Sequence, residues 1–224
     1  MARRYRTRRK TRFKRRMKLY IRFGMFILVV LLIALLGMKI FKLGSFSDAE
    51  KDDGFYAHVQ QPDMKVELLT VNPYSRPGTK SGKIKNIVIH YTANPGTSAK
   101  QNRNYFENLK DSKERKASSH FVIGLDGEII QCIPTWEIAY ASNERNYDTI
   151  SIETCHQDES GIYTEETYQS LIQLTAWLCE KNRLTEEDVI RHYDITKKIC
   201  PKYFVEDEDA WNQFKLDVKK VLKE

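Results

Sequence analysis

The sequence predicts an α/β fold, a mixed central β-sheet flanked by helices, with one transmembrane helix preceding it. The first observation is that several short segments alternate apolar and polar residues, as half-buried strands do. The second is that longer segments with apolar residues at helical spacing separate these strands. The third is an uncharged run of 16 residues, Phe23–Met38, in a chain of 224 residues.

The segment before the sheet predicts a membrane anchor. Residues 1–22 hold 12 Lys and Arg and no acid, which predicts a cytoplasmic tail by the positive-inside rule. Residues 23–42 are predicted to form the transmembrane helix, because about 20 apolar residues cross a bilayer. The chain is then expected to be a single-pass protein of the cell membrane, with everything after Lys42 outside. A cleaved signal peptide is the rival interpretation, which the length of the apolar run and a poor cleavage site at Ala49 oppose.

The remainder of the chain has the opposite charge. From Leu43 onward 23 bases face 30 acids, a net charge of −7. The basic tail and the acidic body are expected on opposite sides of the bilayer, so nucleic-acid binding is the least favoured function and no such partner is expected. Residues 43–60 are polar and aperiodic, which predicts a linker. Residues 61–224 are enough for one domain with its own core, expected as a monomer.

Four segments of this domain alternate as strands do. In Asn86–Tyr91 the alternation puts Ile87 and Ile89 opposite Val88 and His90. The segment 120–133 predicts a hairpin around the turn Asp126-Gly127. The other two predicted strands are 149–155, which carries Glu153 opposite Ile150 and Ile152, and 188–194, which carries His192.

Three segments predict helices. They cover Ser98 to about Lys110, Thr164 to about Asn182, and the residues after Asp209. The second buries one stripe at helical spacing, made of Tyr168, Leu171, Ile172, Thr175, Leu178 and Cys179.

One set of side chains points to a metal. His192 stands eight positions before Cys200, and His90 ends a strand that gives way at once to a polar Pro-Gly loop. Two imidazoles and a thiolate make a three-ligand zinc site with a fourth position open for water, as in catalytic zinc centres. Of the other histidines, His58 and His156 are expected to be solvated, and His120 to be a hydrogen-bonded core residue.

Four motifs then carry a resemblance. The segments IVIHYTANPGTSAKQN, SSHFVIGLDGEIIQCIP, IAYASNERNYDTISIE and VIRHYDITKKICP occur in this order. The chain from about Asn72 to Val221 resembles the type-2 N-acetylmuramoyl-L-alanine amidases, which are related to peptidoglycan recognition proteins and phage amidase lysozymes. The ending H-x7-C-P after a strand is the most specific of these motifs.

The resemblance implies a function and a set of roles. It makes residues 61–224 a zinc amidase domain that hydrolyses the amide bond between the N-acetylmuramoyl lactyl group and L-alanine of peptidoglycan, at the outer face of the membrane. It implies that His90, His192 and Cys200 are the zinc ligands. It further implies that Glu153 is the catalytic acid/base and that Lys198 stabilises the oxyanion.

Two positions depart from the family pattern. Ser119 stands where phage-lysozyme relatives place a catalytic tyrosine, which leaves the acid/base role to Glu153. The stretch Ala139-Tyr140-Ala141 lacks a histidine that many relatives have. Three further cysteines are expected to be free thiols: Cys132, Cys155 and Cys179.

Two alternative functions stay open. The same fold can bind muropeptides without cutting them, although binding modules typically lack the metal cysteine. A zinc peptidase acting within the stem peptide is excluded only by the resemblance.

Overall fold

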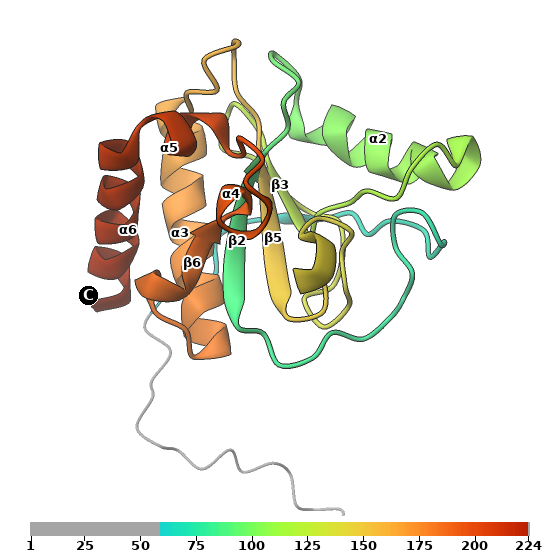
Figure 1. Cartoon of the computed structure of the whole chain (residues 1–224), viewed down its shortest axis with the longest axis horizontal. Coiled ribbons are helices and arrows are strands. Elements are labelled where there is room, and N and C mark those ends of the chain that lie inside the picture. The colour runs from blue at the N-terminus through green and yellow to red at the C-terminus, as the bar shows by residue number, and fades with distance from the viewer. Residues whose placement is uncertain (1–58, 224) are drawn as a thin grey trace, which may run out of the picture. The chain divides into compact units, whose positions relative to one another are not determined.

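The computed structural model describes residues 59–223, whose strands form one mixed six-stranded sheet with helices on both faces (Figure 1). The strand order is β1-β4-β3-β5-β2-β6. The strands are β1 (Lys65–Val66), β2 (Asn86–Tyr91), β3 (Phe121–Ile123), β4 (Ile129–Gln131), β5 (Thr149–Thr154) and β6 (Val189–Arg191). The predicted fold class, a mixed sheet flanked by helices, is confirmed for these residues.

The centre of the sheet is parallel. β2 lies between β5 and β6 and is parallel to both, with Ile87 opposite Ile150 and His90 opposite Glu153. The predicted hairpin is confirmed, since β3 and β4 pair antiparallel across a turn in which Gly127 has φ +79°. A left-handed backbone of this kind favours glycine, because any larger side chain strains it.

The helices divide between the two faces of the sheet. Helices α3 (Glu165–Asn182), α5 (Lys202–Glu206) and α6 (Glu208–Lys223) pack on one side, and α2 (Ala99–Ser112) packs on the other (Figure 1). The larger core lies under α3 and α6 and includes Ile87, Ile89, Phe121, Ile150, Ile152, Leu171, Leu178, Phe204 and Phe214. The smaller core lies under α2 and includes Ala99, Phe106, Leu109, Val122, Ile130, Cys132 and Cys155.

Side-chain caps explain where the two long helices begin. The Ser98 hydroxyl accepts a hydrogen bond from the Gln101 backbone, and the Gln101 side chain accepts one from the Ser98 backbone. Thr164 caps α3 through a bond from the Thr167 N–H. These residues satisfy backbone donors that have no partner within the helix. Both predicted starts are therefore confirmed.

One predicted strand is shorter than expected. Alternation predicted a strand over 188–194, but β6 ends at Arg191 and His192 begins the short helix α4 (His192–Thr196). The Asp194 carboxylate accepts from the Arg191 backbone N–H at 2.8 Å, which caps the helix and stops the strand. Two short 3-10 helices, η1 (Asn143–Arg145) and η2 (Glu186–Asp188), complete the elements.

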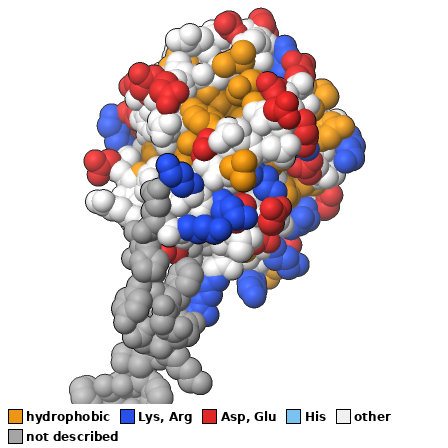
Figure 2. Space-filling view, turned by 90° about the vertical axis from the view of Figure 1, so that its left-hand side faces the viewer, with side chains coloured by type: hydrophobic (Ala, Val, Ile, Leu, Met, Phe, Trp, Pro, Cys, Tyr) orange, Lys and Arg blue, Asp and Glu red, His pale blue; other side chains and the backbone are white. Residues whose placement is uncertain are grey.

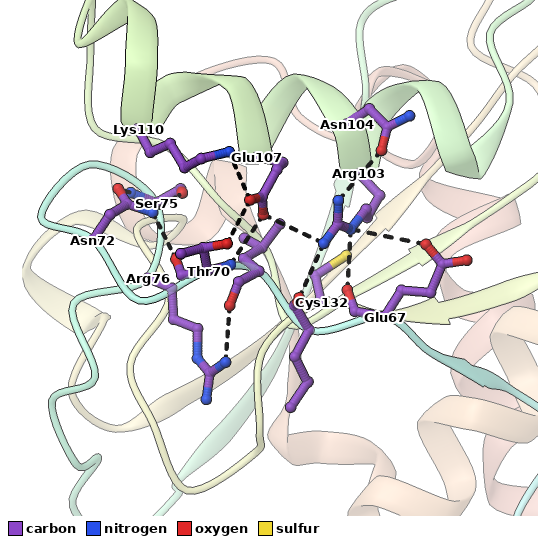
Figure 3. A network of polar contacts seen from close by, with 12 residues as sticks. Glu67, Thr70, Asn72, Ser75, Arg76, Arg103, Asn104, Glu107, Lys110 and Cys132 are labelled. Carbon is purple, nitrogen blue, oxygen red and sulfur yellow. Dashed lines mark hydrogen bonds and ion pairs between the residues drawn. The ribbon is translucent and has the colours of Figure 1, made fainter.

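A polar network fastens the segment before β2 to helix α2 (Figure 3). The Glu107 carboxylate accepts from the Thr70 N–H at 3.0 Å and from the Thr70 hydroxyl at 2.7 Å. Arg103 donates to the Glu67 and Leu68 carbonyls at 3.0 and 2.9 Å. Burial raises the pKa of Glu107, but hydrogen bonds from Lys110 and Thr70 outweigh it and hold that pKa at about 2. The Glu107 carboxylate is therefore ionised at neutral pH, the form in which it accepts these hydrogen bonds.

The face formed by α3, α5 and α6 carries a tyrosine-rich groove of about 310 Å³. Tyr163, Tyr168 and Tyr203 line it, and the Tyr168 hydroxyl donates to Asp217 at 2.7 Å. Figure 2 shows hydrophobic side chains gathered on this side of the molecule.

The first described residues contact helix α3. The Val59 N–H donates to the Glu180 carboxylate at 2.9 Å, and Gln173 donates to the Gln60 carbonyl at 3.0 Å. Within residues 59–223 no helix has the length and apolar character needed to cross a bilayer. The predicted tail 1–22, the anchor 23–42 and all but the last two residues of the linker 43–60 lie outside the described residues.

Candidate metal centre

Three predicted ligands meet at the carboxyl ends of β2 and β6. His90 lies near the end of β2, His192 follows β6 directly, and Cys200 lies in the loop between α4 and α5. One donor atom from each lies within 4.8 Å of the other two, and all three residues are buried. The Cys200 Sγ is 3.8 Å from His90 Nδ1, and the two imidazole centroids are 4.6 Å apart. The parallel pairing of β2 with β6 brings the two histidines together across 102 residues of sequence, because both strands end at the same edge.

The free atoms of these residues fit a metal. His192 Nε2 contacts the Asn143 Oδ1 at 3.3 Å, while its Nδ1 is buried with no hydrogen-bond partner. His90 Nε2 is also buried without a partner. Burial lowers the pKa of both imidazoles, and the Lys198 charge lowers both further. Neutral imidazoles with a free nitrogen are the form that binds metal.

The thiol of Cys200 needs a cation to ionise. Burial raises its pKa to about 12, and the carboxylate of Glu153 acts in the same direction. A hydrogen bond from the Tyr91 backbone and the charge of Lys198 oppose this shift. Two imidazoles and one thiolate match the ligand chemistry of zinc, which enforces thiolate formation.

Glu153 lies beside this set and is not one of its three members. It stands opposite His90 on β5, so both side chains project from the same face of the sheet. The residue is half-buried, and its Oε2 is enclosed without a partner. Burial raises the pKa of Glu153 to about 8, against the opposing charge of Lys198. A carboxyl group with a pKa in this range can exchange protons near neutral pH.

A cavity of about 200 Å³ joins these groups. Lys198 is exposed at its rim, close enough to influence the pKa of Glu153, His90, His192 and Cys200. The structure thus brings together all five residues that the sequence singled out. The remaining lining residues are Tyr91, Thr92, Ala93, Asn102, Tyr105, Phe106, Arg115, Ala117, Ser118, Tyr140 and Ala141.

Several of these lining residues were not predicted from the sequence. Asn102, Tyr105 and Phe106 come from α2, and Arg115 follows that helix. Asn102 ends the first of the four quoted motifs, whereas Tyr105, Phe106 and Arg115 belong to none of them. Tyr105 is 40% accessible, whereas the apolar face of its helix is buried.

Two of the remaining histidines, His120 and His156, have structural roles. His120 contacts the Ser151 hydroxyl at 3.0 Å and the Glu137 carbonyl at 2.9 Å, as predicted for a core residue. The prediction that His156 is solvated is wrong. Its ring is buried against Tyr91, with centroids 5.1 Å apart, and Nδ1 lies 2.7 Å from the Asp158 carbonyl. His58 lies outside the described residues.

Ser119 and the cysteines take no part in the cavity wall apart from Cys200. Ser119 is fully buried and donates to the Ser151 carbonyl at 3.0 Å. All four cysteines have free thiols and are buried. Cys179 lies in the core under α3, whereas Cys132 and Cys155 lie in the core on the other side of the sheet.

Comparisons with known proteins agree with this geometry. Residues 80–203, more than half of the chain, match the family model described as N-acetylmuramoyl-L-alanine amidase. The N-acetylmuramoyl-L-alanine amidase CwlL of Bacillus licheniformis is 37% identical over 168 residues, which cover 69% of this chain and 46% of that protein. The amidase BlyA of Bacillus subtilis is 33% identical over 172 residues, which cover 67% of this chain and 45% of that protein.

Solved structures share the fold. The structure of PlyL superposes with a TM-score of 0.61 at 23% identity and covers 70% of this chain and 98% of its own. The catalytic domain of XlyA superposes with a TM-score of 0.59, also at 23% identity, and covers 70% of this chain and 99% of its own.

The mixed α/β sheet and the His-His-Cys cluster at the carboxyl ends of its parallel strands are typical of a metal-dependent hydrolase. The family match identifies which family of this class the chain falls in. The chain belongs to the type-2 N-acetylmuramoyl-L-alanine amidase family. It spans about half the length of the curated relatives that it matches.

Proposed function

We propose that this domain is a zinc-dependent N-acetylmuramoyl-L-alanine amidase. It hydrolyses the amide bond between the lactyl group of N-acetylmuramic acid and L-alanine of peptidoglycan. The observation that carries the proposal is the cluster of donor atoms from His90, His192 and Cys200 beside an unpartnered carboxylate in an open cavity. The names of the amidase relatives give the substrate class.

His90, His192 and Cys200 hold the metal in this proposal. When bound, zinc supplies Lewis acidity, which acidifies water and polarises a carbonyl group. Glu153 takes a proton from the attacking water at a carboxylate oxygen and passes it to the nitrogen of the leaving L-alanine as the C–N bond breaks. Lys198 Nζ stabilises the negative charge that develops on the carbonyl oxygen.

The test is an analysis of the ends released from purified peptidoglycan. The full chain, purified in detergent, is incubated with peptidoglycan, and the products are identified by mass spectrometry. Free lactyl carboxyl groups paired with new alanine amino termini are expected, and a chelator should abolish their release. New amino termini within the stem would make the protein a peptidase, and wall binding without release would make it a binding module.

We propose further that the reaction takes place at the outer face of the cell membrane. The support is the sequence of the first 42 residues, a basic segment followed by an apolar run. External protease on spheroplasts is expected to remove the domain and leave a small membrane-bound fragment. A soluble secreted form that starts near Glu50 would show that the apolar run is a cleaved signal.

A further inference from the structure

The His192 ring has one side-chain hydrogen-bond partner, and that partner comes from a different part of the chain. The Oδ1 of Asn143, at the start of η1, lies 3.3 Å from His192 Nε2. The two residues are 49 positions apart, so the contact depends on the tertiary fold and not on the local sequence. The opposite nitrogen, Nδ1, is buried with no hydrogen-bond partner, and His192 is one of the three residues of the metal cluster.

The turn that carries Asn143 is held at both ends. The Asn146 Oδ1 accepts from the backbone N–H groups of Ala141 and Ser142, at 3.0 and 2.6 Å. Arg145 donates to Asp148 at 2.7 Å and to the Asn86 Oδ1 at 2.6 Å, which ties the turn to the start of β2. Asn143 itself has φ +53°, a left-handed conformation that asparagine tolerates better than most residues. The turn is therefore fixed by its own bonds, and the Asn143 side chain remains for His192.

We propose that Asn143 is a positioning residue of the metal centre, which fixes the proton of His192 on Nε2 and leaves Nδ1 free as the ligand atom. A neutral imidazole carries one ring proton, and the hydrogen bond made by one nitrogen decides which nitrogen binds metal. An amide oxygen accepts but cannot donate, so Asn143 Oδ1 selects the Nε2–H tautomer. Partners of this kind typically change metal affinity about 10- to 100-fold. The inference rests on the proposed function, because it takes the cluster to bind zinc.

Two substitutions separate the effect of the Asn143 side-chain oxygen from the effect of its left-handed backbone conformation. Asn143→Gly keeps the left-handed turn at no steric cost and removes the acceptor. Asn143→Asp keeps an acceptor oxygen at the same place. We expect the Gly variant of the full chain to bind zinc about 10- to 100-fold more weakly in competition with a chromophoric chelator, and the Asp variant to bind as tightly as the parent.

The tautomer of His192 is measured separately by NMR spectroscopy of the zinc-free chain. With ¹⁵N-labelled histidine the chain gives signals from five histidines. The His192 signals should show the Nε2–H tautomer in the parent and the Asp variant, and a mixture of tautomers in the Gly variant.

The outcomes distinguish this inference from the proposed function. Equal zinc affinities in the three proteins, or an Nδ1–H tautomer of His192 in the parent, would overturn the role of Asn143 and leave the zinc site standing. Failure of the parent chain to bind zinc would overturn the zinc site itself, and the role of Asn143 with it.

Discussion

The two faces of the central sheet are made by the same strands, yet their chemistry differs. Under α3 and α6, Ile87, Ile89, Ile150 and Ile152 are completely buried in an apolar core. On the opposite face, adjacent residues of the same strands project polar groups, and atoms of His90 and Glu153 have no hydrogen-bond partner. Alternation with period two lets one strand stabilise the fold with one set of side chains and hold reactive groups with the other. The reactive groups are thus backed by a rigid apolar layer, which keeps them in place.

The largest effect expected on the polar face is that of Cys200→Ser. A neutral hydroxyl is a poor substitute for a thiolate ligand, so we expect zinc and turnover to be lost together. Zinc content by elemental analysis and product release from peptidoglycan measure the two. Cys155→Ser is the matched control, since that thiol is buried on the same side of the sheet outside the cluster. A Cys200→Ser chain that retains full activity without zinc would refute the ligand assignment.

Glu153→Gln should separate chemistry from metal binding. The change keeps the shape of the side chain and removes the base, so turnover should fall about 100- to 10,000-fold while zinc content is unchanged. We expect the upper half of that range, because Ser119 is buried and bonded to Ser151 and cannot replace the lost group. Normal turnover would reduce Glu153 to a structural residue. Loss of zinc would make it part of the metal site instead.

A substitution on the apolar face tests whether that face of the sheet stabilises the fold. Ile152→Ala removes a fully buried side chain next to Glu153 in sequence, and it should lower the free energy of unfolding by about 2–5 kcal/mol. Denaturant titration measures the loss. Val66→Ala, at a residue that is 62% exposed, should change stability by less than about 0.5 kcal/mol. If Ile152→Ala also weakened zinc binding under conditions where the chain stays folded, the two faces would not be independent.

The last effect expected is a pH dependence of stability that originates at Glu153. Its folded pKa is raised to about 8 from an unfolded value of 4.5, so its contribution favours the folded state below pH 4.5 and is lost as the pH rises toward 8. The zinc-free parent should therefore lose stability from pH 5 to 8 relative to zinc-free Glu153→Gln. Parallel stability curves for the two proteins would contradict the raised pKa.

Much of the fold could be predicted because local signals agreed with tertiary packing. The alternation in Asn86–Tyr91 and the turn at Gly127 match β2 and the β3–β4 hairpin. The helix starts at Ser98 and Thr164 were marked by residues whose side chains cap helices. The end of β6 was not predicted, because the bond from the Arg191 backbone to Asp194 ends the strand without changing the alternation.

The residues of the site also divide into those that the sequence predicted and those that it did not. His90, His192 and Cys200 could be proposed because their residue types and spacing have a chemical meaning. Asn143 and Arg115 could not, since their closeness to the cavity depends on how two loops fold over the sheet edge. His156 was misjudged because its polar, turn-rich surroundings gave no sign of the stacking against Tyr91.

The contact between Val59 and Glu180 has a consequence for reach. Helix α3 leads back from the end of β5 to the start of β6, so Val59 sits near the amino ends of the parallel strands, whereas the metal ligands sit at the carboxyl ends. A six-residue strand spans roughly 20 Å, so the two ends of β2 are about that far apart. Residue 59 and the cavity therefore lie toward opposite ends of the parallel strands.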